Sequence, residues 1–301
     1  MNKRKRVVIS QKKELLVSLL LKNETNINQV DNFGITQLYI AAENNNIKVV
    51  SLLLNNGVNV NQADKDGCTA LYFASFNNHM AIVSLLLNHR ANVNQANNNN
   101  GRTPLHGASH YGYMEVVSLL LNHGANVNQA DNDGETPLYI ASFIGHTKIV
   151  SLLLNNRANV NQAKNNGDTP LYIASQKGHV EVVSLLLNNG ANINQSDNYG
   201  QTPLYIASYN DHVEVVSLLL KNGANANQAI KDGVSPLFIS SENGHVEMVS
   251  LLLNNRANVN QAIKNGDTPL YIASYRGHVG IVSLLLNAML LQNGGKQLLS
   301  D

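Results

Sequence analysis

The chain has 301 residues, a formal net charge of +1 at pH 7 and 44% hydrophobic residues. This balanced charge does not indicate a nucleic-acid-binding protein or one that binds an acidic membrane surface. The single cysteine, Cys68, excludes an intrachain disulfide, and no run of about 18 apolar residues predicts a membrane span. We therefore expect a cytoplasmic protein.

The chain begins with a tail, residues 1–10, that contains the basic run Lys3-Arg4-Lys5-Arg6. Such a run is typical of a nuclear import signal, but it also suits a solvated tail, which we favour. Residues 11–28 follow as a predicted N-terminal cap. Its helix, Gln11 to Lys22, lacks the partner helix that accompanies every later copy of the same pattern.

Two strings of residues then recur in fixed phase along the chain. One opens with Thr or Ser, as in Thr-Pro-Leu-Tyr-Ile-Ala from Thr136 to Ala141. The other is Ser-Leu-Leu-Leu, which recurs every 33 residues except for one step of 34. The extra residue falls in the run Asn97 to Asn100, where a loop can absorb it. The first string opens eight units, at Thr36, Thr69, Thr103, Thr136, Thr169, Thr202, Ser235 and Thr268.

One unit illustrates the local structure that the pattern predicts. Thr136 is a candidate N-cap, and Pro137 suits the first helical position because its missing N–H costs nothing there. A second helix is predicted over Thr147 to Asn155, where apolar residues recur at helical spacing. Residues 158–167 form an extended, turn-rich connection. A unit this short cannot bury its own apolar face, so neighbouring units must stack into one core.

The repeated pattern resembles the ankyrin repeat, a unit of 33 residues with a Thr-Pro-Leu-His-x-Ala signature. The resemblance covers residues 11–287 and implies an all-α ankyrin-repeat solenoid of stacked helix-turn-helix units with β-hairpin-like loops. After residue 287 the pattern is lost, and we expect residues 288–301 to form an irregular C-terminal tail. The resemblance also implies a non-catalytic scaffold that binds another protein in a concave groove.

The sequence departs from the family pattern at two positions. The signature histidine survives only at His106, since Tyr or Phe replaces it in the other seven units, so its hydrogen bonds must be rebuilt or omitted. The glycine that usually follows the second helix is replaced by Arg90, Arg157 and Arg256. A positive φ at these arginines would cost about 1 kcal/mol each relative to glycine.

No residue pattern indicates an enzyme, a metal site or a cofactor. Histidines recur at the start of the second helix, but equivalent residues on stacked helices lie about 8–10 Å apart, too far to share one zinc ion. We expect them to have a structural role in the turn. His106 and His110 have the spacing of a helical metal pair but lack further ligands. Cys68 has no basic neighbour to activate it.

The predicted partner-binding surface consists of positions that vary between units and that the repeat itself does not require. They are the loop tips, the residue before each opening Thr or Ser, and the end of each first helix. Exposed aromatic residues and arginine at such positions are frequent anchors of protein interfaces. The predicted contact residues are Phe33, Phe76, Arg102, Tyr111, Glu135, Phe143, Asp168, Lys177, Tyr199, Tyr209, Asp267, Tyr275 and Arg276.

Two alternative functions remain open. The abundant asparagine and the similarity of the repeats favour a host-directed effector of an intracellular microbe or virus. The irregular C-terminal residues favour the targeting region of a larger enzyme. We expect a monomer that binds neither nucleic acid nor membrane. The family resemblance further implies candidate asparaginyl hydroxylation sites at Asn61, Asn94, Asn128, Asn161 and Asn260.

Overall fold

The structure is a computed structural model that describes residues 26–292. The predicted tail, residues 1–10, and the predicted cap helix lie outside this range; residues 27 and 28 form a turn. Sixteen α-helices fill the described range in eight successive pairs, which confirms the predicted all-α repeat fold. They are α2 (Gln37–Glu43), α3 (Ile47–Asn55), α4 (Ala70–Phe76), α5 (Met80–Asn88), α6 (Pro104–Tyr111), α7 (Met114–Asn122), α8 (Pro137–Ile144), α9 (Thr147–Asn155), α10 (Pro170–Lys177), α11 (Val180–Asn188), α12 (Pro203–Tyr209), α13 (Val213–Lys221), α14 (Pro236–Asn243), α15 (Val246–Asn254), α16 (Pro269–Arg276) and α17 (Val279–Gln292).

The first helix of each pair starts at the predicted cap. The hydroxyl of Thr136 accepts a hydrogen bond of 3.1 Å from the N–H of Tyr139, and Thr169 and Ser235 do the same in later repeats. This bond satisfies one of the free N–H groups that begin a helix. Proline then occupies the first position of α10, where it has no hydrogen bond to lose.

In the first seven pairs, a left-handed residue follows the second helix. Glycine fills this position after α11, as Gly190 with φ of 82°. Arginine fills it elsewhere: φ is 65° at Arg90, 66° at Arg157 and 64° at Arg256. These side chains carry the conformational cost that glycine avoids.

Each pair of helices closes over a small set of invariant apolar residues. The leucine of the first string and the middle leucine of the second are fully buried, as Leu171 and Leu186 show. Small alanines such as Ala174 are completely covered, which lets neighbouring helices approach closely. The burial of such residues in every internal pair is the main stabilising contribution to the stack.

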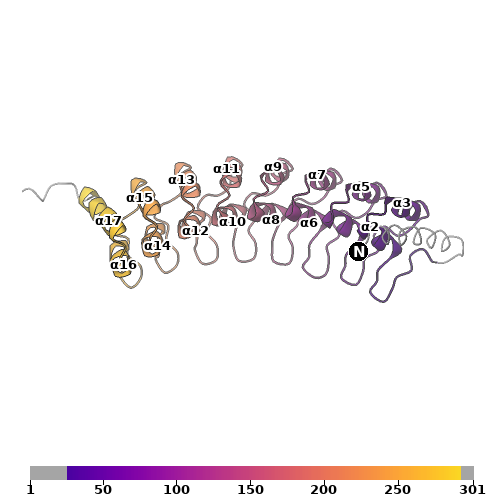
Figure 1. The fold of residues 1–301 in the computed structure, drawn as a ribbon, viewed down its shortest axis with the longest axis horizontal. Coiled ribbons are helices and arrows are strands. Elements are labelled where there is room, and N and C mark those ends of the chain that lie inside the picture. Colours follow the sequence, from indigo (N-terminus) through magenta and orange to yellow (C-terminus); the bar gives the residue numbers. More distant parts are fainter. Residues whose placement is uncertain (1–25, 293–301) are drawn as a thin grey trace, which may run out of the picture. The chain divides into compact units, whose positions relative to one another are not determined.

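The chain divides into two compact units. Unit 1 comprises residues 1–140 and 155–158, and unit 2 comprises residues 141–154 and 159–301. Within each unit, first helices contact first helices and second helices contact second helices, as in α10 against α12 and α11 against α13. The first and second helices thus form two rows, and the loops project from the row of first helices (Figure 1).

Asparagine side chains fasten each loop to the next repeat. Oδ1 of Asn161 accepts a hydrogen bond of 2.7 Å from the N–H of Asn192, and its Nδ2 donates one of 3.2 Å to the carbonyl of Gly190. Asn94 makes the same two bonds, to Asn126 and Gly124. These bridges join residues about 30 positions apart. They explain why the loops need an amide side chain rather than merely a turn-forming residue.

The C-terminal end differs from the expectation of an irregular tail from residue 288. α17 continues to Gln292 and is 14 residues long, whereas α15 has nine. The reason is the sequence Ala288-Met289-Leu290-Leu291, which replaces the Asn-Arg or Asn-Gly ends of earlier repeats with strong helix formers. Residues 293–301 lie outside the described range.

Candidate protein-binding surface

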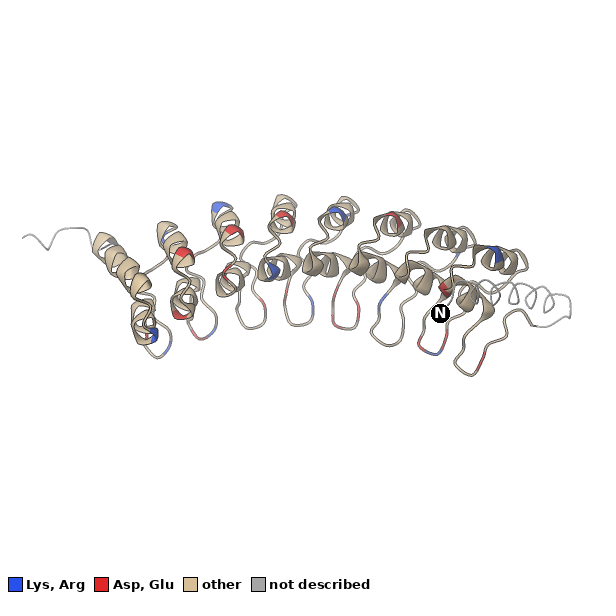
Figure 2. Ribbon diagram, in the orientation of Figure 1, with Lys and Arg blue, Asp and Glu red and all other residues tan. Residues whose placement is uncertain are grey.

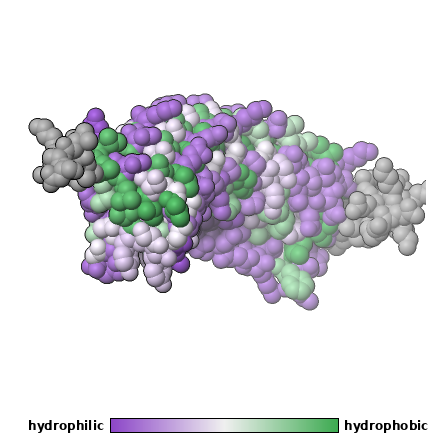
Figure 3. All heavy atoms as spheres, turned by 60° about the vertical axis from the view of Figure 1, so that its left-hand side comes forward, coloured by the Kyte–Doolittle hydropathy of each residue, from purple (hydrophilic) through white to green (hydrophobic). Residues whose placement is uncertain are grey.

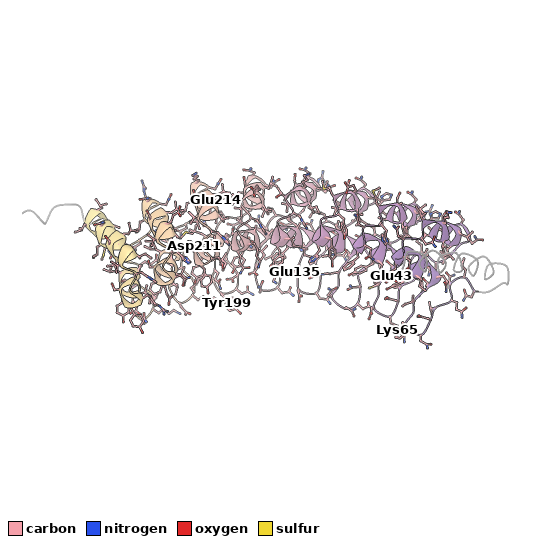
Figure 4. The ribbon with its side chains drawn as sticks, viewed as in Figure 1. Glu43, Lys65, Glu135, Tyr199, Asp211 and Glu214 are labelled. Carbon is pink, nitrogen blue, oxygen red and sulfur yellow. The ribbon has the colours of Figure 1, made fainter. Side chains whose placement is uncertain are left out.

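The tips of successive loops are tied together by backbone hydrogen bonds within each unit. In unit 1, the N–H of Lys65 donates to the carbonyl of Phe33 at 3.0 Å, and Asn98 donates to Asp66 at 2.7 Å. In unit 2, Lys231 donates to Tyr199 at 3.4 Å. Lys65 in unit 1 and Tyr199 in unit 2 each lie at a loop tip (Figure 4). The tips are therefore held in place before any partner binds.

Within each loop, an Asp or Asn side chain holds the tip. Oδ1 of Asp197 accepts hydrogen bonds from the N–H groups of Tyr199 and Gln201, at 2.9 and 2.7 Å. Asp31 accepts equivalent bonds from Phe33 and Ile35. This local bonding suits Asp and Asn in tight turns. It leaves the tip side chains free to point outward, and Phe33 and Tyr199 are 68% and 66% exposed.

An aromatic cluster in unit 1 consists of Tyr72 and Phe76 on α4, Tyr111 at the end of α6 and Tyr113 at the start of α7; Phe76 and Tyr111 are exposed, and Tyr72 and Tyr113 are half-buried. The Phe76 and Tyr111 rings meet edge to face, with centroids 4.7 Å apart. Tyr72 stacks on Phe76 at 6.2 Å, and Tyr113 stacks on Tyr111 at 5.7 Å. A Cβ on Gly107 would lie 3.4 Å from the Phe76 ring, in ordinary contact.

Arg102 and Glu135, two predicted contact residues, bind each other. The guanidinium of Arg102 lies 2.8 Å from Oε2 of Glu135 and 3.0 Å from the buried Oδ2 of Asp131. The Arg102 side chain is about a quarter exposed. This arrangement couples two neighbouring loops of unit 1. Because Arg102 and Glu135 already bind each other, their charged groups are less available to a partner.

In unit 2, the predicted residues at the ends of the first helices are exposed. Lys177 Nζ lies 4.7 Å from the centroid of the Phe143 ring, a cation–π contact between adjacent repeats. Tyr209 is exposed, as is Tyr275, which stacks on Tyr271. Arg276 is also exposed and pairs with Glu242 at 2.7 Å.

The structure places the two predicted acidic residues of unit 2 differently from the aromatic ones. Asp168 is buried, and its Oδ2 accepts a hydrogen bond of 2.9 Å from Asn166. Asp267 is half-buried and makes the same contact with Asn265 at 2.8 Å. The sequence gives no sign of this burial, since both residues vary between repeats. We leave Asp168 out of the proposed surface.

The repeated histidines are structural. In five repeats the histidine donates a ring N–H to a backbone carbonyl near the end of the first helix of the preceding repeat. For His179 the partner is the carbonyl of Phe143 at 3.1 Å, and for His212 it is that of Gln176 at 3.0 Å. Within residues 26–292, no three His, Cys, Asp or Glu side chains are grouped so that they could hold a metal ion.

His106 makes the bonds that the family signature histidine is expected to make. Its Nδ1 contacts the N–H and hydroxyl of Thr103 at 3.1 and 2.7 Å, and its Nε2–H donates to the carbonyl of Glu135 at 3.0 Å. Burial lowers the pKa of His106 to about 4, so the ring is neutral. In another repeat Tyr172 replaces it, and the phenol donates to Gln201 at 3.1 Å.

Cys68 lies in the loop before α4, and its side chain is buried. Burial, and then the negative charges of Asp64 and Asp66, raise the pKa of its thiol to about 12. Such a thiol stays protonated at neutral pH and is a poor nucleophile. The side chain therefore packs as a small apolar group.

Stacked helix pairs, capped by Thr or Ser and bridged by loop asparagines, define a repeat protein of the helix-turn-helix-plus-loop class. Comparison with protein families identifies the family of this repeat. Residues 7–97, 92–164, 156–230 and 224–293 match the family described as "Ankyrin repeats (3 copies)". The chain therefore belongs to the ankyrin repeat family. No curated protein matches the sequence.

Proposed function

We propose that the chain is a non-catalytic scaffold that binds a protein partner through its loop tips and the ends of its first helices. Ankyrin repeats are generally protein–protein interaction modules. The observation that carries the proposal is the aromatic cluster of unit 1, in which Phe76 and Tyr111 touch each other yet both remain exposed. Clustered exposed aromatic rings are the typical anchors of a protein interface.

The hydrogen-bonded loop tips support the same proposal. Binding costs free energy when flexible loops must be ordered, and here backbone bonds already fix the tips. In unit 2, Phe143 with Lys177 and the exposed Tyr209 offer further contacts of the same kind. A protein that contacts several consecutive repeats could gain from each of them without rearranging the scaffold.

The row of second helices is a poorer candidate for this role. Its exposed faces carry solvent-exposed acidic side chains at one repeated position: Glu115, Glu181, Glu214 and Glu247. Figure 2 shows the charges scattered over this row, and Glu214 lies there in Figure 4. We therefore propose that the partner binds to the loop tips and the ends of the first helices, not to the second helices. Among residues 26–292, no helix is long and apolar enough to cross a membrane.

The test is affinity purification from the source cell with the full chain and two double variants. Phe76→Ala with Tyr111→Ala removes the unit 1 anchors, and Phe143→Ala with Tyr209→Ala removes those of unit 2. We expect at least one variant to lose a partner that the unmodified protein retains. Glu181→Ala with Glu214→Ala is the matched control on the second helices. If this control loses the partner and both aromatic variants keep it, the proposed surface is wrong.

A further inference from the structure

Two positions at the end of each first helix meet across neighbouring repeats. They are the seventh and eighth residues after the opening Thr or Ser, as Phe143 and Lys177 are in unit 2. Twice in unit 2 the eighth position supplies a cation to the seventh. Lys177 Nζ lies 4.7 Å from the centroid of the Phe143 ring, and the guanidinium of Arg276 lies 2.7 Å from Oε1 of Glu242. The seventh position thus accepts a cation with either a ring or a carboxylate.

Unit 1 has both kinds of acceptor at these positions but no Lys or Arg beside them. Glu43, at the end of α2 (Figure 4), is a seventh residue, and the eighth residue that follows α4 is Asn77. Glu43 is exposed, and no Lys or Arg within residues 26–292 pairs with it. The next pair is Phe76 and Tyr111, whose exposed rings meet edge to face. Because α2, α4 and α6 pack in succession, the two acceptor sites are one repeat apart.

The surface around these acceptors is negatively charged. From each loop tip to the end of the following first helix, unit 1 carries seven acidic and two basic side chains, whereas the same segments of unit 2 carry five of each. Arg102, one of the two basic residues, is already bound by Asp131 and Glu135. In the described part of unit 1, Lys65 is therefore the one remaining cation of these segments. The charged residues of unit 1 counted here are Asp31, Glu43, Asp64, Lys65, Asp66, Arg102, Asp131, Asp133 and Glu135.

Another exposed area is purely apolar and is less informative about a partner. Hydrophobic residues gather at the end of unit 2 that comes forward in Figure 3, where Val279 and Leu291 of α17 are 78% and 81% exposed. An apolar face of this kind accepts many occupants. A carboxylate and aromatic rings within a negative surface instead select a cation.

We propose that this surface of unit 1 binds a basic segment of the partner protein, with one Arg or Lys side chain on Glu43 and another on the rings of Phe76 and Tyr111. The partner thereby supplies the cations that Lys177 and Arg276 supply within unit 2. Arginine suits both sites, since a guanidinium pairs with carboxylates and stacks on aromatic faces. Stacked helices lie about 8–10 Å apart, so the two basic residues of an extended segment are about three positions apart. The inference rests on the proposed function, which it narrows to one class of partner.

The test selects peptides that bind the purified full chain from a random library displayed on phage. We expect enrichment of peptides with two Arg or Lys residues about three positions apart. Fluorescence anisotropy with the synthetic peptides then gives dissociation constants, which should rise about tenfold in Glu43→Lys and rise further with salt. Glu115→Lys makes the same charge change on a second helix of unit 1. As the matched control, it should bind like the unmodified chain.

Two further measurements separate direct contact from damage to the fold. Asn77→Arg places beside Glu43 the cation that Arg276 provides in unit 2, so it should weaken peptide binding about tenfold by occupying the carboxylate. Replacing one basic residue of the peptide by Glu should restore its affinity for Glu43→Lys. Lysine at residue 43 suits the C-terminal end of α2, so folding should persist, as circular dichroism can verify.

The remaining outcomes distinguish this inference from the proposed function. Selected peptides without basic residues that lose affinity in Phe76→Ala with Tyr111→Ala would overturn the basic partner and leave the proposed function intact. If no selected peptide responds to this double variant, both are wrong. A gain in peptide affinity of about tenfold when alanines replace Lys3-Arg4-Lys5-Arg6 would show that the chain's own basic run occupies the surface, which would overturn binding of a separate partner there.

Discussion

The imidazole of His212 lies against the backbone of Gly178 in the preceding repeat. A Cβ on Gly178 would come within 2.8 Å of two atoms of that ring. The glycine also has a φ of 75°. The same relationship joins Gly145 to His179 and Gly244 to His278, so the glycine that ends a first helix provides the space in which the next histidine binds.

Where glycine is absent, the histidine binds differently. Asn45 and Asp211 occupy the glycine position with φ of 54° and 60°. The following histidines, His79 and His245, then use Nδ1 instead of Nε2. The carbonyl they bind is 37 residues earlier, whereas the spacing is 36 for the histidines that follow glycine. A side chain at this position therefore redirects a hydrogen bond in the next repeat.

Gly178→Ala tests this coupling. We expect the free energy of unfolding to fall by about 2–4 kcal/mol, because alanine strains the left-handed backbone and also displaces His212. Urea denaturation of the purified chain measures the change. Gly190→Ala is the control: its φ of 82° is similar, but a Cβ there meets nothing within 4 Å. Equal losses in the two variants would show that the histidine contact is not important.

His106 predicts a pH dependence of stability. Its pKa is about 4 in the folded protein and about 6.5 when unfolded, so the unfolded state takes up the proton more readily as the pH falls. The contribution of His106 to folding stability is complete above about pH 6.5 and is lost as the pH falls towards 4.

Between pH 7 and pH 5, protonation of His106 in the unfolded state should lower the free energy of unfolding by about 2 kcal/mol. Urea denaturation at both pH values measures the loss, and His106→Tyr, which installs the residue of other repeats, should remove that share of it. His123→Gln, at an exposed position, should retain it. An identical pH dependence in His106→Tyr and the unmodified chain would contradict the argument.

Asn161→Ala removes the two hydrogen bonds that the Asn161 side chain makes to the next repeat. We expect a loss of about 1–2 kcal/mol in the free energy of unfolding, because two backbone groups lose their partner while water partly replaces it. Thermal and urea denaturation measure the effect. Asn188→Ala, at an exposed position at the end of α11, should change stability by less than about 0.5 kcal/mol.

Arg256→Gly should stabilise the chain. The arginine has a φ of 64° and an exposed side chain, so glycine relieves about 1 kcal/mol of backbone strain. The neighbouring Asn255 has a φ of −102°, and Asn255→Gly should instead reduce stability. Calorimetry measures the melting temperatures of both variants. A lower melting temperature for Arg256→Gly than for the unmodified chain would contradict the expected relief of strain.

Much of the fold could be predicted because the information is local. Thr136 and Pro137 start a helix within their own neighbourhood, and the predicted second helix, Thr147 to Asn155, agrees with α9. Arg157 has a positive φ at the position after that helix where the repeat pattern usually has glycine. Only α17 was misjudged, because its helix-forming residues were interpreted as a departure from the repeat.

The surface was harder to predict because it depends on contacts between repeats. Nothing near Asp168 in the sequence indicates that it is buried, and nothing near Arg102 indicates that it binds Glu135, 33 residues away. The asparagine bridges were missed for the same reason, since Asn161 meets Asn192 only after stacking. Equal spacing between repeated asparagines is the signal that could have identified them.

These asparagine bridges also determine how the stack comes apart. Each bridge makes the loop of one repeat part of the boundary of the next, as Asn161 does for Gly190. When a repeat opens, two backbone groups of its neighbour therefore lose their hydrogen bonds to the asparagine side chain, and loss of order spreads along a unit rather than stopping at one helix pair. Under mechanical force or heat, several repeats of a unit should accordingly unfold together in one cooperative step.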